Sequence, residues 1–176
     1  PPGELNNITD YISNRKLLIS SPGGSLYEGW AIHDFLKGKV DEIGVVGVCA
    51  SAATIIMLAA PMRWGTPNSR YLIHNPWTSI EGDSKSMEKT ALDLKIEQEN
   101  LLKRYVECTG VNPERLQELM NKSIYLTADE ALNINLIHNI KPEIMDLKKM
   151  EEKMNFLEKT IFALKKFFVK NLVVQD

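Results

Sequence analysis

One stretch decides the fold: Val45-Val-Gly-Val-Cys-Ala-Ser-Ala-Ala-Thr-Ile-Ile-Met-Leu-Ala-Ala-Pro-Met62, which carries no charged residue along its whole length. It is at the lower limit for a membrane-spanning helix, which needs about 17 to 25 apolar residues. Against a membrane span, Gly47 and the valine-rich start are typical of a strand that turns into a helix, and no aromatic belt or basic flank marks a membrane interface. The stretch therefore predicts a buried strand followed by a buried helix from about Ser51 to Ala60.

Strands and helices alternate on both sides of this stretch. The predicted strands are Lys16–Ile19, Ile43–Gly47 and Arg70–His74, and the further predicted helices are Leu26–Phe35, Ser84–Cys108, one that begins at Asn112-Pro113 and one opened by the capping box Thr127–Glu130. A proline at position 76 ends the third strand, because proline has no amide proton and keeps its predecessor extended. The alternation predicts an α/β protein with a parallel or mixed sheet, in one domain that covers residues 1–142.

Beyond that domain, apolar residues recur at alternating intervals of three and four, as in a coiled coil. They are Leu147, Met150, Met154, Leu157, Ile161, Leu164 and Phe168. We expect residues 143–176 to form a C-terminal amphipathic helical extension. Three roles are open for it: packing on its own domain, binding a sister subunit or a partner helix, and lying as a basic helix on a membrane surface.

The composition is typical of a soluble globular protein. The 176 residues are 44% hydrophobic and 25% charged, which is enough apolar material for one sizeable core and excludes a disordered chain. Basic and acidic residues nearly cancel, 21 against 23, so we expect neither a nucleic-acid partner nor a membrane partner. Two cysteines, Cys49 and Cys108, lie in helix-like stretches, which argues against a disulfide framework. The default location for such a chain, and the one we expect, is the cytoplasm. Metal-ligand spacings are absent from the sequence, so no metal and no organic cofactor is expected.

Three features have the residue types that acyl-transfer chemistry needs. The turn Pro22-Gly23-Gly24-Ser25 follows a strand, and its glycines let main-chain N–H groups face a ligand. Ser51 is surrounded by small residues where a strand becomes a helix, and His74 ends a strand, where α/β proteins bind ligands. Each feature also has an ordinary structural interpretation: a turn, a helix N-cap and a buried histidine. The other two histidines, His33 and His138, are expected to be surface or packing residues.

The order and spacing of four motifs resemble the Clp protease proteolytic-subunit family. They are Ser-Pro-Gly-Gly-Ser at 21–25, Gly-x-x-Ala-Ser at 47–51, Pro-Asn-Ser-Arg at 67–70 and Ile-His-Asn-Pro at 73–76, and the resemblance spans residues 16–140. Ile-His-Asn-Pro-Trp at 73–77 and Leu-Thr-Ala-Asp-Glu-Ala at 126–131 look closest to the phage and prophage branch. Members of that branch process capsid proteins during head assembly.

The resemblance implies a fold, a site and an assembly. The fold is the crotonase-like spiral of strand-strand-helix units, and the activity is that of a serine endopeptidase subunit which itself uses no ATP. Ser51 falls on the nucleophile, His74 on the general base, and the N–H groups of Gly24 and Ala52 on the oxyanion hole. The helix Ser84–Cys108 matches the handle that interlocks two stacked rings, which makes the homo-oligomer self-compartmentalising. The implied partners are protein or peptide substrates, with a capsid protein or an AAA+ unfoldase as further partners.

The sequence departs from the family at the third catalytic residue. Ser123 stands where the family has an aspartate, in the run Asn121-Lys-Ser-Ile-Tyr-Leu-Thr-Ala128. An aspartate there holds the histidine in the tautomer that accepts the serine proton. Three outcomes are open: a neutral partner such as Ser123 or Asn121 orients His74, a carboxylate from elsewhere does so, or the chain is a catalytically impaired assembly protein.

Two other chemistries are compatible with the implied fold. A crotonase-type acyl-CoA enzyme uses a similar glycine turn as its oxyanion hole, and a serine–lysine dyad replaces histidine by lysine. His74 within Ile-His-Asn-Pro, after the Gly-x-x-Ala-Ser motif, favours proteolysis over acyl-CoA chemistry. No motif in the sequence places a lysine as a base.

Overall fold

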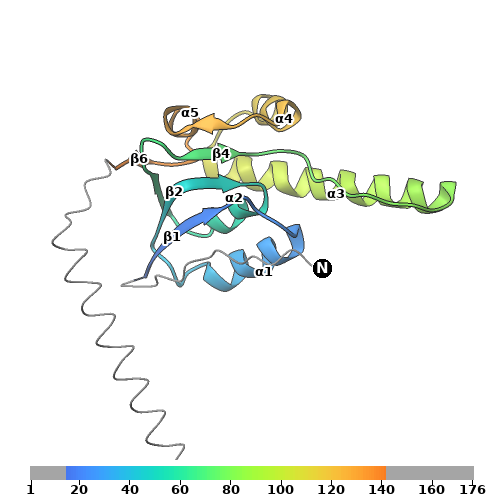
Figure 1. Ribbon diagram of the computed structural model, residues 1–176, viewed down its shortest axis with the longest axis horizontal. Coiled ribbons are helices and arrows are strands. Elements are labelled where there is room, and N and C mark those ends of the chain that lie inside the picture. The colour runs from blue at the N-terminus through green and yellow to red at the C-terminus, as the bar shows by residue number, and fades with distance from the viewer. Residues whose placement is uncertain (1–14, 142–176) are drawn as a thin grey trace, which may run out of the picture. The chain divides into compact units, whose positions relative to one another are not determined.

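The computed structural model describes residues 15–141, which form a six-stranded sheet with helices packed around it (Figure 1). The predicted helical extension over residues 143–176 lies outside the described residues, so that expectation and the domain boundary at 142 stay predictions. Within residues 15–141, every helix is too short or too polar to cross a membrane. Residues 45–62, the apolar stretch that opened the sequence analysis, form part of a strand, a helix and the turn after it, as predicted.

The central strand of the sheet is β2 (Glu42–Ala50). β1 (Lys16–Ser21) lies parallel along one edge of it, while the opposite edge is shared by two strands. β3 (Met62–Gly65) pairs in parallel with the first half of β2, and β4 (Arg70–Leu72) pairs in parallel with the second half. Two strands on one edge of a longer strand make the sheet curl rather than extend flat.

Short strands complete the sheet at its two ends. β5 (Leu126–Thr127) runs antiparallel to β4, and β6 (Asn139–Ile140) runs parallel to β3. The strand order is β5-β4-β2-β3-β6, with β1 paired to β2. The prediction of a mixed α/β sheet is confirmed.

The helices begin and end where their capping residues stand. α1 (Leu26–Leu36), α3 (Ser84–Thr109), α4 (Pro113–Lys122) and α5 (Ala128–Asn133) follow the N-caps Ser25, Asp83, Asn112 and Thr127, each of which accepts a main-chain N–H with its side chain. α3 ends at Gly110, whose φ of 69° allows a left-handed cap without a steric cost. These local signals explain why the predicted helix boundaries agree closely with the structure.

Four expectations about the elements between α1 and α3 were wrong. β2 extends to Ala50 rather than ending at Gly47, and the following helix, α2 (Ala52–Met57), is shorter than the predicted range from Ser51 to Ala60. β3 was not predicted, because it has four residues and includes Arg63, a charged residue that is only 4% exposed. The third predicted strand ends at Leu72 instead of His74, so His74 belongs to the loop after β4.

The core lies between β2 and the helices that cover the sheet. It is built from aliphatic side chains of β1, β2 and α2 together with Tyr71 of β4 and Leu101 and Tyr105 of α3. All six residues of α2 are buried, which explains the long uncharged stretch in the sequence. A helix that is apolar on every side needs a protein environment on every side.

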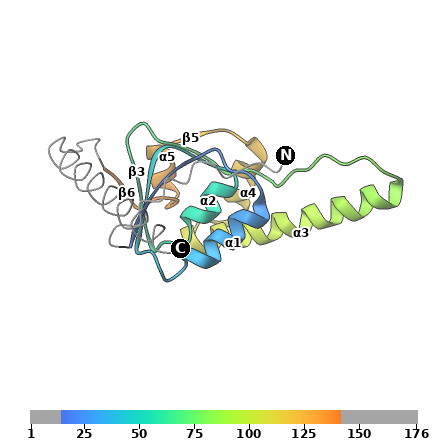
Figure 2. The same ribbon diagram turned by 60° about the horizontal axis from the view of Figure 1, so that its bottom comes forward.

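The longest helix, α3, has two different halves. Its C-terminal half contributes Leu101, Tyr105 and Thr109 to the folded body. Its N-terminal half extends away from the sheet, accompanied by the chain that follows β4, in both views (Figures 1 and 2). With 26 residues, α3 is about 39 Å long, so one end reaches well beyond the core that holds the other.

Candidate active site

Ser51 and His74 meet because of the register between β2 and β4. Ala50 pairs with Leu72 in parallel, so the residues that follow both strands leave the sheet at the same edge. The main-chain N–H of Ser51 continues this pairing by donating to the carbonyl of Leu72 at 2.8 Å. As a result, the Oγ atom of Ser51 lies 2.7 Å from Nε2 of His74, a hydrogen-bond distance.

The backbone of Ser51 is held in an uncommon conformation. Its φ of 56° and ψ of −131° lie outside the regions that residues with a Cβ favour, and such strain at a strand-to-helix turn is typical of a nucleophile elbow. Thr54, in the helix that follows, stabilises the turn because its hydroxyl donates a hydrogen bond to the carbonyl of Ser51 at 2.6 Å. The hydroxyl of Tyr105 is 2.6 Å from the same Thr54 oxygen and donates to it, because the one proton of Thr54 is already used. A buried chain from α3 therefore supports the serine.

The glycine turn after β1 packs directly against Ser51. Gly23 has a φ of 96°, and a Cβ built on it would lie 2.7 Å from the Cβ of Ser51 and 2.5 Å from the carbonyl oxygen of Ala50. Only glycine allows both this backbone angle and this approach. The close approach brings Gly24, the next residue of the turn, to the same cavity as Ser51.

A cavity of about 340 Å³ opens beside the serine and the histidine. Gly24, Ala52, Ser51 and His74 all line it, so the structure brings together the four residues that the sequence placed in one site. Ala52 is the first residue of α2 and directly follows Ser51. Both Gly24 and Ala52 therefore lie beside the serine, and acyl transfer needs main-chain N–H donors beside its nucleophile to stabilise the oxyanion.

The other ring nitrogen of His74 faces a main-chain carbonyl. Nδ1 of His74 lies 2.7 Å from the carbonyl oxygen of Asn75. A carbonyl oxygen only accepts hydrogen bonds, so Nδ1 carries the proton and Nε2 presents its lone pair to the Ser51 hydroxyl. This is the tautomer that a general base needs.

Asn75 is itself held in place from both sides. Pro76 restricts Asn75 to an extended backbone, and the side chain of Asn75 is bonded to two residues of α4. Its Nδ2 donates to Oδ1 of Asn121 at 2.9 Å, and its Oδ1 accepts from Nε2 of Gln117 at 3.1 Å. Gln117 also donates to Asn121 at 2.8 Å, which closes a ring of three amides behind the histidine.

Asn121 and Ser123 were the two candidates for the third catalytic residue, and neither side chain is the hydrogen-bond partner of His74 Nδ1. Asn121 contacts the side chain of Asn75, one residue away from the histidine ring. Ser123 ends α4 in a left-handed conformation, is exposed, and donates its main-chain N–H to Leu119. The acceptor on Nδ1 is the Asn75 carbonyl, and the sequence analysis missed both it and Gln117. The only signal for them was the Asn-Pro pair that follows His74.

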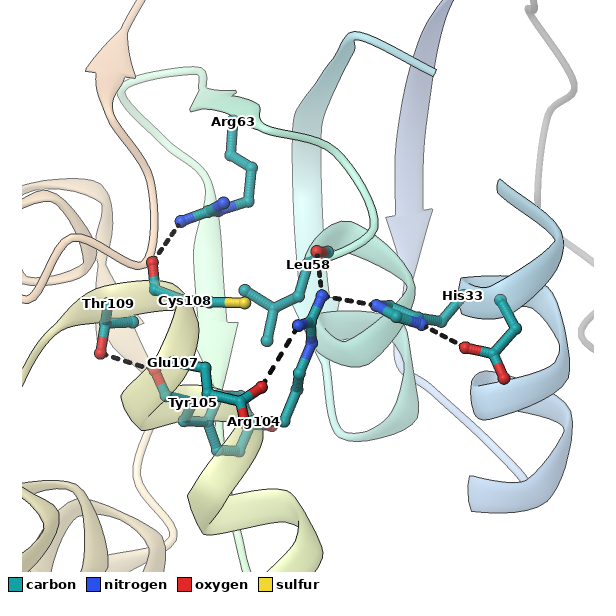
Figure 3. Close-up of polar contacts among 9 residues, drawn as sticks. His33, Leu58, Arg63, Arg104, Tyr105, Glu107, Cys108 and Thr109 are labelled. Atoms are coloured by element: carbon teal, nitrogen blue, oxygen red, sulfur yellow. Dashed lines mark hydrogen bonds and ion pairs between the residues drawn. The ribbon is translucent and has the colours of Figure 1, made fainter. Parts of the chain in front are cut away.

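Two arginines hold the C-terminal half of α3 against the body (Figure 3). Arg104 of α3 donates to Nε2 of His33 in α1 at 2.8 Å and to the carbonyl of Leu58 at 3.0 Å. Arg63 of β3 donates to the carbonyl of Cys108, near the end of α3, at 3.1 Å. These bonds fix the part of α3 that carries Tyr105 and one wall of the cavity.

The remaining histidines serve packing, as expected. His33 is 3% exposed, and its Nε2 faces a guanidinium that only donates, so the ring is neutral and its Nδ1 donates to Asp34. Burial, assisted by the charge of Arg104, lowers the pKa of His33. The pKa of His138 is lowered by partial desolvation of its ring, which packs against Arg63, and by the charge of that guanidinium 3.0 Å from its Nε2. Both histidines are bonded to arginines that position α3 and β3.

The cysteine nearest in sequence to Ser51 does not compete with it as a nucleophile. Cys49 is only two residues away, but it is completely buried, and burial raises the pKa of its thiol far above the neutral range. Both cysteines are free. Among residues 15–141, no three histidine, cysteine or carboxylate side chains are grouped so that they could hold a metal ion.

The chain is similar in sequence to known peptidase subunits, which agrees with the serine–histidine contact in the structure. The chain is 37% identical over 136 residues to the ATP-dependent Clp protease proteolytic subunit 2 of Treponema denticola, which covers 74% of this chain and 68% of that protein. It is 34% identical over 137 residues to the ATP-dependent Clp protease proteolytic subunit of Paracoccus denitrificans, covering 75% and 68%.

A solved structure shares the fold. A ClpP1 variant from Listeria monocytogenes with one Asn-to-Asp substitution superposes with a TM-score of 0.63 and 28% sequence identity, covering 73% of this chain and 74% of that one. The prediction of a ClpP-type α/β fold is confirmed by this likeness. The family model named Clp protease matches residues 7–143, which include both Ser51 and His74. The chain belongs to the Clp protease family of serine-type peptidases.

Proposed function

We propose that this chain is a serine endopeptidase with Ser51 as its nucleophile and His74 as its general base. The observation that carries the proposal is the pair of contacts on the imidazole: Nε2 to Ser51 Oγ and Nδ1 to the Asn75 carbonyl, both at 2.7 Å. The first contact gives the proton of the serine hydroxyl a place to go. The second keeps the accepting nitrogen free of a proton.

The reaction follows from these positions. Ser51 Oγ attacks the carbonyl carbon of a peptide bond while its proton moves to Nε2 of His74, and the N–H groups of Gly24 and Ala52 stabilise the oxyanion. His74 then gives the proton to the leaving amine, which breaks the C–N bond and leaves an acyl-serine. Water, deprotonated by the same imidazole, releases the acid and restores the serine.

The Asn75 carbonyl supports an active enzyme rather than the impaired alternative. In serine proteases, replacing the triad aspartate by asparagine lowers turnover about 10⁴-fold because the histidine takes the wrong tautomer. A main-chain carbonyl has no proton to donate and does not impose that tautomer. Its partial charge stabilises the imidazolium less than a carboxylate would, so we expect a catalyst slower than one with a full triad.

A fluorophosphonate probe tests the assignment of the nucleophile. The unaltered chain should be labelled and should hydrolyse unstructured peptides, whereas Ser51→Ala should lose both, measured by probe fluorescence in gels and by peptide cleavage. Ser25→Ala is the matched control, because Ser25 also lines the cavity but serves as the N-cap of α1. Equal labelling of Ser51→Ala would refute the assignment. Absence of both labelling and cleavage in the unaltered chain would favour the catalytically silent assembly protein.

We further propose that the chain assembles into stacked rings through α3. The half of α3 that extends from the body carries Met87, Leu92 and Ile96, which are 48%, 60% and 48% exposed. Apolar side chains of this size on a projecting helix are typical of an interface. The double variant Leu92→Asp, Ile96→Asp should therefore lower the mass that light scattering measures.

The matched control for assembly is Lys95→Asp on the same helix. It changes the net charge by the same amount as the double variant, and Lys95 is exposed and polar. A fall in mass with the apolar pair and not with Lys95→Asp supports assembly through α3. An unchanged mass in the double variant would contradict it.

The partners implied by the resemblance stay predictions. An unfoldase partner fits a peptidase that cleaves short peptides but leaves a folded protein intact, and a comparison of both substrates with the purified chain tests this. A capsid protein as substrate is tested by its cleavage under the same conditions. We also propose a cytoplasmic location, which the two free cysteines favour and cell fractionation would check.

A further inference from the structure

The cavity beside Ser51 is acidic on the wall that α3 provides. The residues of α3 that line it include Asp93 and Glu97, which are one turn apart and therefore on the same face of the helix. Of the described residues that line the cavity, none is lysine or arginine. The site that would hold a peptide next to the serine thus carries two negative charges from side chains and no permanent positive one.

Asp93 and Glu97 form no ion pair with any residue in the described part of the protein. The ion pairs of residues 15–141 involve other acidic residues. Like charges four residues apart destabilise a helix, so the pair costs stability unless a cation lies between or beside them. Another carboxylate of α3, that of Glu107, does form an ion pair, with Arg104. The absence of such a pair at Asp93 and Glu97 is therefore not a general property of this helix.

Aromatic side chains at the same cavity add a second, independent feature. Trp77 and Tyr27 both line it and are 77% and 71% exposed, so neither ring is covered by the described part of the protein. Aromatic faces attract ammonium and guanidinium groups through their quadrupoles. Rings and carboxylates around one cavity form the kind of site that binds an organic cation.

The rest of the cavity suits the uncharged part of such a ligand. Leu94, Leu101 and Tyr105 of α3 and Leu26 of α1 provide an apolar lining. Lysine and arginine side chains have an apolar stem of three or four methylenes that ends in a cation, which matches an apolar lining joined to acidic and aromatic groups. A purely apolar side chain would leave both carboxylates without a partner.

We infer that the cavity takes a lysine or arginine side chain of the substrate, next to the peptide bond that Ser51 attacks. Asp93 and Glu97 provide the charge recognition, and Trp77 and Tyr27 contact the cation from the rim. This inference rests on the proposed peptidase function and names its substrate class. Because the carboxylates are in contact with solvent, recognition should weaken as salt screens the charges.

The experiment uses two short alanine-rich peptides that differ at one residue, arginine in one and its uncharged isostere citrulline in the other. Binding to the full chain with Ser51→Ala is measured by calorimetry, so that the peptides stay intact. The arginine peptide should bind about ten-fold more tightly at low salt, as expected for two partly exposed ion pairs with a cation–π contact. The ratio should approach one in the variant that also carries Asp93→Asn and Glu97→Gln.

Glu99→Gln is the matched control, because Glu99 is exposed on the same helix and does not line the cavity. It should leave the ten-fold ratio unchanged. Equal binding of the two peptides, or a preference that survives Asp93→Asn with Glu97→Gln, would overturn the inference.

Hydrolysis by the chain with Ser51 intact separates this inference from the proposed function. Cleavage of both peptides at the same rate would leave the peptidase standing and refute the basic specificity. Preferential binding of the arginine peptide without any cleavage would support the acidic cavity and refute the peptidase.

Discussion

His74→Ala should lower kcat/KM for peptide hydrolysis by on the order of 10⁴-fold or more, the range found when a serine enzyme loses its base. The side chain is 2.7 Å from Ser51 Oγ and is the group that we propose removes the serine proton. Without it, the hydroxyl stays protonated and is a weak nucleophile. Peptide hydrolysis and the rate of fluorophosphonate labelling should fall together, because both begin with attack by the same oxygen.

Two control experiments distinguish loss of the base from loss of the fold. Added imidazole should restore part of the activity of His74→Ala, because a small base can enter the space left by the side chain, whereas a variant that has lost its structure would not respond. Asn121→Ala should cost only a few-fold, mainly in kcat, since Asn121 acts through Asn75 and leaves the Asn75 carbonyl in place. Activity of His74→Ala within ten-fold of the unaltered chain would exclude His74 as the base.

Gly23→Ala should strongly lower activity and destabilise the protein. The new Cβ would overlap Ser51 and the Ala50 carbonyl, and the φ of 96° is unfavourable for alanine. The backbone angle costs about 1–2 kcal/mol and the overlap about 1–3 kcal/mol, so the free energy of unfolding should fall by roughly 2–5 kcal/mol. Because relief of the overlap moves Ser51 itself, hydrolysis should fall by at least about 100-fold even in the folded fraction.

Gly38→Ala separates the two causes. Gly38 also has a positive φ, 76°, but a Cβ there would meet nothing within 4 Å. It should show only the loss of about 1–2 kcal/mol from the backbone angle, with normal hydrolysis. Urea unfolding and peptide cleavage on both variants give the comparison. Equal effects of the two substitutions on activity would show that the turn has no role in positioning Ser51.

Local interactions made much of the fold predictable from the sequence. The start of α3 at Asp83, of α4 at Asn112 and of α5 at Thr127 depends on hydrogen bonds within a few residues, which a sequence pattern shows directly. β3 was missed because its stability comes from distant partners. Arg63 can be buried there because carbonyls from two distant segments, those of Cys108 and of Asn135 and Leu136, accept its protons.

The same distinction applies to the site. Ser51, His74 and the glycine turn were predicted because their residue types and order are informative. The acceptor on His74 Nδ1 was not, because a main-chain carbonyl exists at every residue and has no signature of its own. The amide ring that holds it joins Asn75 to Gln117 and Asn121, more than forty residues later, and only the folded chain brings them together.

That carbonyl gives the active site an unusual tolerance to genetic change. A carboxylate acceptor disappears with a single codon substitution, whereas a peptide oxygen is present whichever amino acid is encoded at position 75. A chain with this arrangement therefore keeps an oriented imidazole without any acidic side chain beside it. What selection must then preserve is the path of the backbone through Asn75 and Pro76.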